Sequence, residues 1–79
     1  MKTTNYSGYS VGVTTEPMYY GSNCSDDDAE TIATDLARMI EAEFPGITTT
    51  RDQSPVRGPD DETCHEINRW IQENWTAAL

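Results

Sequence analysis

The sequence predicts a small α+β protein in which two or three antiparallel strands carry two helices on one face, in the order ββαβα. Three observations favour this class. An alternating segment near the start and a threonine-rich segment near the middle are typical of strands, and two longer stretches carry apolar residues at helical spacing. At 79 residues the chain is expected to form one domain, residues 1–79.

The first predicted element is a strand within residues 6–15, YSGYSVGVTT, where apolar residues alternate with small or polar ones. Pro17 should end that run, because proline removes a ladder hydrogen bond. Residues 18–20 then indicate a short second strand or an extended segment before a Gly-Ser-Asn turn. We therefore expect a hairpin over residues 6–20.

The next element is a helix over residues 26–43. Ser25 precedes three aspartates, which supplies an N-cap hydroxyl with the carboxylate of Asp28 three residues on, much as in a capping box. Pro45 and Gly46 should end the helix. Its apolar stripe has steps of three and four residues and consists of Ala29, Ile32, Ala33, Leu36, Met39, Ile40 and Phe44.

The last third of the chain predicts a strand, a loop and a second helix. Residues 47–52, ITTTRD, are β-branched but polar, which suits a strand at a sheet edge. Residues 53–59 hold two prolines and a glycine and indicate a loop. A helix should begin near Gly58 or Pro59 and extend to Trp75. Its stripe, with both tryptophans expected in the core, is Cys64, Ile67, Trp70, Ile71, Trp75 and Ala78.

The net negative charge lies on the two predicted helices. The chain carries net charge −9, of which residues 26–43 supply −6 and residues 60–75 supply −4, so the remainder sums to +1. Six acids lie at predicted helix starts, where each complements the helix dipole by about 0.3–1 kcal/mol. Glu41 and Glu43 lie near the end of the first helix, where the helix dipole disfavours negative charge. Helix chemistry does not explain them, so they indicate that the negative electrostatic potential is selected for function.

The charge density of the first helix approaches that of one nucleic-acid strand. Eighteen residues span about 27 Å and give one charge per ~4.5 Å, against one per ~3.4 Å for a DNA strand. Such a surface could imitate a phosphate track and occupy a groove rich in Arg and Lys. The expected partner-binding residues are Asp27, Glu30, Asp35, Glu41, Glu43, Glu66 and Glu73.

The residues do not predict catalysis, a metal site or a cofactor. No phosphate-binding, dinucleotide or serine-nucleophile motif occurs. His65, the one histidine, comes directly after Cys64, and consecutive helical residues point about 100° apart. With Cys24 these residues fall one ligand short of a zinc site. Five bases against fourteen acids also argue against direct binding of nucleic acid.

No apolar run predicts a signal peptide or membrane anchor, so we expect a cytoplasmic protein with both cysteines reduced. A disulfide stays open, either between Cys24 and Cys64 if they lie close enough or between chains, and with the latter a homodimer. An alternative interpretation of the acidity is adaptation to salt, favoured by eleven threonines and a single lysine beside four arginines. The chain would then be a halophilic or virion-associated structural module. Its contacts would lie on the neutral sheet side, around Tyr6, Tyr9, Tyr19 and Tyr20.

In size, acidity, lack of catalytic motifs and α+β layout, the chain resembles the small phage-encoded anti-CRISPR proteins, especially inhibitors of type I systems. The resemblance is one of overall profile along the whole chain, with no diagnostic motif. It implies a non-enzymatic inhibitor in the host cytoplasm. Such an inhibitor would bind a basic, nucleic-acid-handling subunit of a CRISPR-Cas surveillance complex and block target DNA binding.

Overall fold

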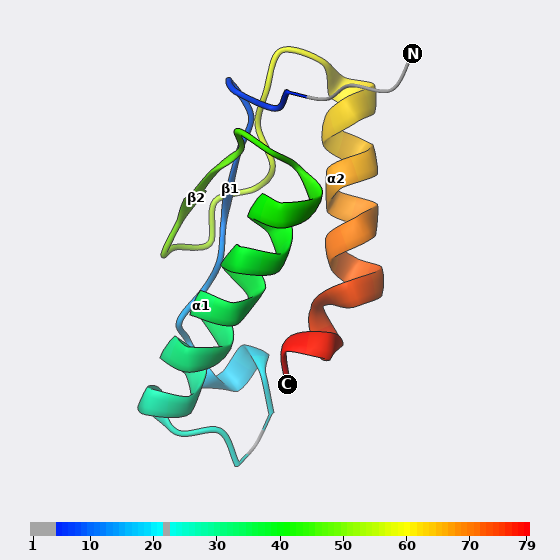
Figure 1. The fold of residues 1–79 in the computed structure, drawn as a ribbon. Coiled ribbons are helices and arrows are strands. Elements are labelled where there is room, and N and C mark those ends of the chain that lie inside the picture. Colours follow the sequence, from blue (N-terminus) through cyan, green and yellow to red (C-terminus); the bar gives the residue numbers. More distant parts are fainter. Residues whose placement is uncertain (1–4, 22) are drawn as a thin grey trace.

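The structure is a computed structural model that describes residues 5–21 and 23–79. The molecule is elongated, with extents of 42 × 20 × 17 Å, and its two long helices run antiparallel along the long axis (Figure 1). In chain order the elements are β1 (Ser10–Gly12), the 3-10 helix η1 (Pro17–Tyr19), α1 (Asp26–Glu43), β2 (Thr48–Thr50), α2 (Asp61–Asn74) and the 3-10 helix η2 (Trp75–Ala78).

The predicted antiparallel hairpin is wrong, and so is the order ββαβα. β1 and β2 form a parallel pair, and residues 18–20 are not a strand. After Pro17 the chain turns in a 3-10 helix, in which the Tyr20 amide donates to the Pro17 carbonyl at 2.9 Å. The chain therefore enters α1 instead of pairing back on β1. A strand that comes after a crossover helix returns in the original direction, which makes the pair parallel.

β1 is the central segment of the small sheet. Its register with β2 pairs Ser10 with Thr48, while on its other edge Ser10 forms an antiparallel bridge with Arg57. The Gly12 amide also donates to the Ser54 carbonyl at 2.9 Å. A Cβ atom on Gly12 would overlap the backbone of Ser54 and the side chain of Asp52, so only glycine lets the loop cross there.

The core lies between the sheet and α1. β1 and the residue after it contribute the buried side chains of Val11 and Val13. Three of the five buried residues of α1 are alanines, whose small side chains add little bulk to the inward face of the helix. The five are Ala29, Ala33, Leu36, Ala37 and Ile40. Ile32 and Met39, expected in the same stripe, are only half-buried.

α2 lies beside α1, on the side of β1 away from β2 (Figure 1), and only Ile67 of this helix is buried. Both tryptophans are half-buried instead of central. Trp70 packs edge-on against Phe44, with ring centroids 5.5 Å apart. Trp75 lies against Tyr20 at 6.2 Å. No helix in residues 5–21 and 23–79 is long and apolar enough to cross a membrane.

The two helix starts use different caps. The Ser25 hydroxyl accepts from the Asp28 amide at 3.1 Å, which confirms the predicted start of α1. α2 begins later than Gly58 or Pro59, because the Asp60 carboxylate accepts from both the amide and the hydroxyl of Thr63, at 3.0 and 2.6 Å. These hydrogen bonds, the hydroxyl bond first, hold the pKa of Asp60 below its ordinary value of 3.8.

Candidate functional site

All seven acids predicted to bind a partner are exposed, but helical geometry spreads them over several sides of the molecule. On α2, Glu66 and Glu73 share a row with Arg69 on the side away from buried Ile67. Glu43, near the end of α1, points to a different side of that helix from Glu41, two residues earlier. The seven therefore do not form one continuous track.

One row of α1 runs along its β2 side. Asp27, Glu30, Arg38 and Glu41 are spaced to lie above one another, and we call them the β2-side row. Glu41 accepts a hydrogen bond from the Thr49 hydroxyl of β2 at 3.2 Å. From the sequence alone Glu41 had no local explanation, and the structure gives its carboxylate a local partner.

Basic side chains of the protein already oppose the β2-side row. Arg38 lies within the row itself. In the first turns of α1, Asp26 and Glu30 line a hollow of about 480 Å³ together with Arg51 and Glu16. The field of this side is thus partly neutralised by the chain's own arginines, and it is weaker than the count of acids indicates.

A second side of α1, about 100° around the helix from the β2-side row, carries Asp28 and Asp35. These two line a hollow of about 520 Å³, which we call the terminal hollow, between α1, the loop before it and the end of the chain. Its lining combines the two acids with apolar, small and uncharged polar residues, and none of the described residues that line it is Lys, Arg or His. It consists of Tyr20, Gly21, Asn23, Cys24, Asp28, Thr31, Ile32, Asp35, Ala78 and Leu79.

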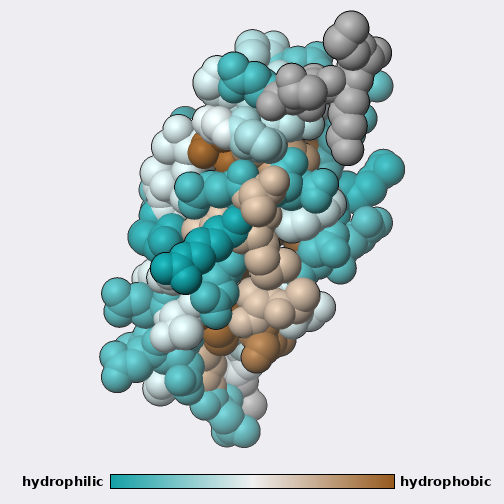
Figure 2. Space-filling view, viewed as in Figure 1, coloured by the Kyte–Doolittle hydropathy of each residue, from teal (hydrophilic) through white to brown (hydrophobic). Residues whose placement is uncertain are grey.

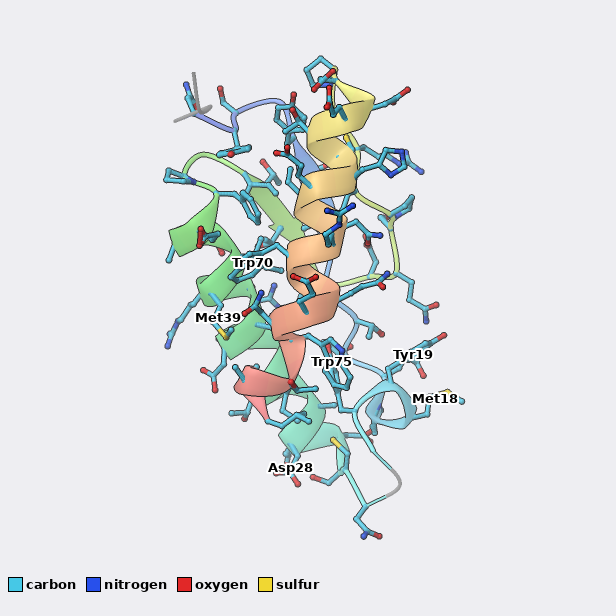
Figure 3. The ribbon with its side chains drawn as sticks, turned by 90° about the vertical axis from the view of Figure 1, so that its right-hand side faces the viewer. Met18, Tyr19, Asp28, Met39, Trp70 and Trp75 are labelled. Atoms are coloured by element: carbon cyan, nitrogen blue, oxygen red, sulfur yellow. The ribbon has the colours of Figure 1, made fainter. Side chains whose placement is uncertain are left out.

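The terminal hollow has an apolar floor. Ile32 and Ala78 are half-buried within it, and Leu79 keeps 61% of its surface exposed. Figure 2 shows apolar surface in a strip along the middle of this face that reaches down to where the first half of α1 meets the end of the chain, with hydrophilic side chains on either side. Figure 3 places Asp28 at this end of α1. The hollow is therefore both apolar and negatively charged.

Sequence reasoning assigned Asp28 to helix capping and Ile32 to the core stripe, and so missed their place in one hollow. The available signal was the spacing, since Asp28, Ile32 and Asp35 stand at i, i+4 and i+7 on one side of a helix. The other wall, formed by Ala78 and the end of the chain, could not be placed without the structure.

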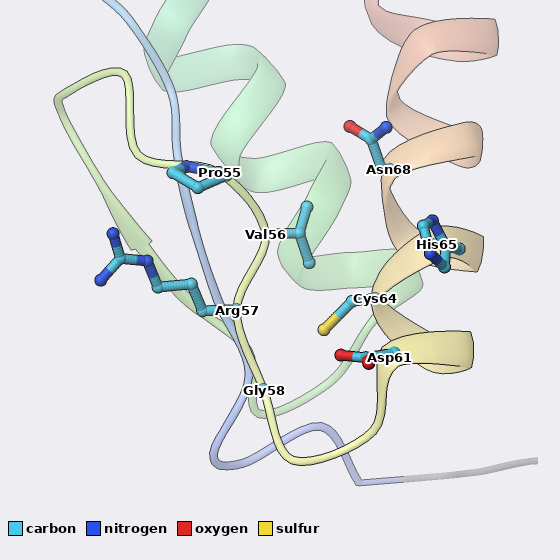
Figure 4. Close-up of a pocket in the computed structure, with 8 residues that line it drawn as sticks. All are labelled: Pro55, Val56, Arg57, Gly58, Asp61, Cys64, His65 and Asn68. Atoms are coloured by element: carbon cyan, nitrogen blue, oxygen red, sulfur yellow. The ribbon is translucent and has the colours of Figure 1, made fainter.

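A third hollow, of about 450 Å³, contains Cys64 and His65 (Figure 4). The two side chains leave α2 in different directions, as expected for consecutive helical residues. Burial, and then the charges of Asp61 and Asp60, raise the pKa of the Cys64 thiol. A raised pKa keeps the sulfur protonated at neutral pH and opposes a nucleophilic role.

The two cysteines lie at opposite ends of the molecule. Cys24 precedes α1 and Cys64 lies in the first turn of α2, and the helices run antiparallel. Both thiols are free, and burial, followed by Asp28 and Asp26, raises the pKa of Cys24 as well. A disulfide within one chain is therefore excluded by geometry.

The neutral surface of the alternative interpretation is smaller than expected. Tyr6 and Tyr9 are buried in the core and cannot contact a partner. Tyr19 is exposed and donates its hydroxyl to the Gln53 side chain at 3.1 Å. Beside it Met18 is 77% exposed, and both side chains project away from α1 (Figure 3).

Comparison with known proteins found no match to this chain among family models, curated proteins or solved structures. The function must therefore be argued from the surface itself.

Proposed function

We propose that the protein is a non-enzymatic inhibitor that acts by binding a basic, nucleic-acid-handling protein surface through its acidic helices. The observation that carries the proposal is the exposure of the acids on both helices of a chain with net charge −9. Complementary charge speeds encounter and selects a basic partner over an acidic one. The resemblance to anti-CRISPR proteins makes a CRISPR-Cas surveillance complex, in the host cytoplasm, the specific partner to test.

The structure changes how such an inhibitor would act. The acids occupy separate rows interrupted by Arg38 and Arg69, so the surface is not a continuous copy of a phosphate backbone. Inhibition would then come from contacts with a local basic patch that covers the DNA path. Such contacts require a limited number of acids, and single rows can be tested separately.

The decisive experiment reverses charge at Asp35 and Glu41 together, with Lys at both positions. Both side chains are exposed, so the fold should persist and the far-UV circular dichroism should be unchanged. We expect binding to the surveillance complex, measured by displacement of labelled target DNA, to be lost. Glu16→Lys, an exposed reversal outside the helices, should cause a smaller loss. Unchanged affinity and salt dependence in the double variant would refute the electrostatic mechanism.

The structural-module alternative makes a separate prediction about salt. If the acidity serves adaptation to salt, melting temperature should rise steeply between low and molar KCl, because screening relieves repulsion among the acids. A partner-binding surface requires no such gain. Thermal melts at the two salt concentrations therefore distinguish the two functions.

A further inference from the structure

We propose that the terminal hollow is the anchoring point for a basic amphipathic helix of the partner protein. The apolar face of that helix would cover Ile32 and Ala78, and two of its basic side chains would pair with Asp28 and Asp35. The inference rests on the proposed function and names the contact that supplies its specificity.

Charge complementarity identifies the occupant. Asp28 and Asp35 line the hollow, and within residues 5–21 and 23–79 no basic side chain lines it. The nearest base in sequence, Arg38, belongs to the β2-side row. In contrast, Asp26 and Glu30 share their hollow with Arg51. A cation supplied from outside would therefore find unopposed carboxylates in the terminal hollow.

The apolar floor excludes a partner that is merely charged. Ile32, on α1 with the two acids, and Ala78, at the end of the chain, both line the hollow, and covering them removes apolar surface from water. A free cation or a polar basic tail would leave the apolar surface of Ile32 and Ala78 exposed to water. An amphipathic helix supplies both chemistries on one face.

The spacing of the acids fits a helix. Asp28 and Asp35 are seven residues apart, which is two turns or about 10.5 Å along α1. Basic residues at i and i+7 of a helix lying along α1 have the same separation, and apolar residues at i+3 and i+4 fall between them. Arginine suits these positions because its guanidinium binds a carboxylate through two hydrogen bonds.

The probe is a synthetic helical peptide with Arg at i and i+7 and Leu at i+3 and i+4, on a neutral background. Binding is measured by fluorescence anisotropy, and methyl NMR of Ile32 and Ala78 reports the location. We expect Asp28→Asn with Asp35→Asn to weaken binding by about tenfold or more, since two charge-assisted hydrogen bonds are lost. The control removes the same charge with Glu16→Gln and Glu62→Gln, two exposed acids outside the hollow and outside the expected partner-binding set, and should change affinity by less than about twofold.

A second matched pair leaves the acids in place. Thr31 and Thr34 both donate their hydroxyls to the carbonyl four residues earlier, at 3.1 and 3.0 Å. Thr31 lines the terminal hollow and Thr34 does not. Thr31→Lys should block the peptide by offering a competing ammonium to the two aspartates, while Thr34→Lys should have little effect.

The outcomes separate this inference from the proposed function. If the two charge-neutralising double variants weakened peptide binding equally, the hollow would not be the anchor. A general acidic surface would remain as the explanation. If neither pair of charge-neutralising variants weakened peptide binding, both proposals would be overturned. Failure of the peptide to bind at low salt, or chemical-shift changes that spare Ile32 and Ala78, would overturn the anchoring helix alone if the surveillance complex still bound.

Discussion

The two long helices carry similar charge patterns but are held to the molecule in different ways. α1 buries five residues, three of them alanines, and four of the five belong to the hydrophobic core that also contains Val11 of β1. α2 buries Ile67 alone and otherwise contacts the core through half-buried aromatic and aliphatic side chains. The comparison shows that an amphipathic stripe predicts which side of a helix faces inward, but not how deeply that side is buried.

The largest effect that would test this comparison is expected at the centre of α1. Ile40 has no exposed surface, and its truncation to Ala should cost about 2–5 kcal/mol through lost burial and a residual cavity. A domain of this size has a comparable margin, so much of the variant should be unfolded. Urea titration by circular dichroism measures the loss. Met39→Ala, half-buried next to it, is the control and should cost much less.

A sharper test loosens α2 while sparing α1. Trp70→Ala removes the edge-on contact with Phe44, and because Trp70 is half-buried we expect about 2 kcal/mol, below the ~3–5 kcal/mol of a fully buried tryptophan. Amide exchange of α2 should accelerate more than that of α1. Hydrogen exchange measured by NMR would show this difference in exchange rate between the two helices. Uniform acceleration in both helices would contradict the difference in attachment.

The smallest effect distinguishes the helix caps by pH. Ser25→Ala should cost about 1 kcal/mol at any pH, because the capping hydroxyl does not titrate in this range. The Asp60 cap differs, since its hydrogen bonds with Thr63 lower its pKa. A group whose folded pKa is depressed stabilises the protein above its unfolded pKa, here near 3.8, and loses that contribution as pH falls through the folded value.

Asp60→Asn should therefore destabilise the protein at pH 6 and have progressively less effect on acidification below pH 4. The Ser25→Ala difference should persist over the same range. Free energies of unfolding from urea titrations at several pH values provide the comparison. A Ser25→Ala effect that disappeared in acid together with the Asp60→Asn effect would contradict the assignment of the two caps.

Local chemistry made the helices predictable from sequence, while pairing made the sheet unpredictable. Ser25 and the apolar spacing of α1 determine its start and its inward side without reference to the rest of the chain. The direction of the strands depends on the conformation of the chain just after Pro17, where a 3-10 turn and an extended strand were both compatible with the residues. With three-residue strands, alternation over residues 6–15 could not indicate a partner.

For the candidate surface, too, one part was predictable from the sequence and another part was not. That the acids would be exposed is a consequence of helical spacing, and all seven are. Which acids are opposed by bases depends on contacts across the fold. Arg51 lines one hollow, and in the described part of the chain no base lines the other. Asp28 gained its place in a candidate site only because the end of the chain packs near the start of α1.

The short outer strand also affects how the molecule behaves in a crowded solution. β2 spans three threonines, two of them exposed, and among the described residues it pairs only with β1. An open strand edge invites other chains to add to the sheet, and that hazard grows with the length and hydrophobicity of the edge. The edge of β2 is short, rich in hydroxyl groups and next to acidic α1, so it offers misfolded chains few backbone groups on which to add a strand. The molecule can thus expose an open sheet edge and still resist aggregation.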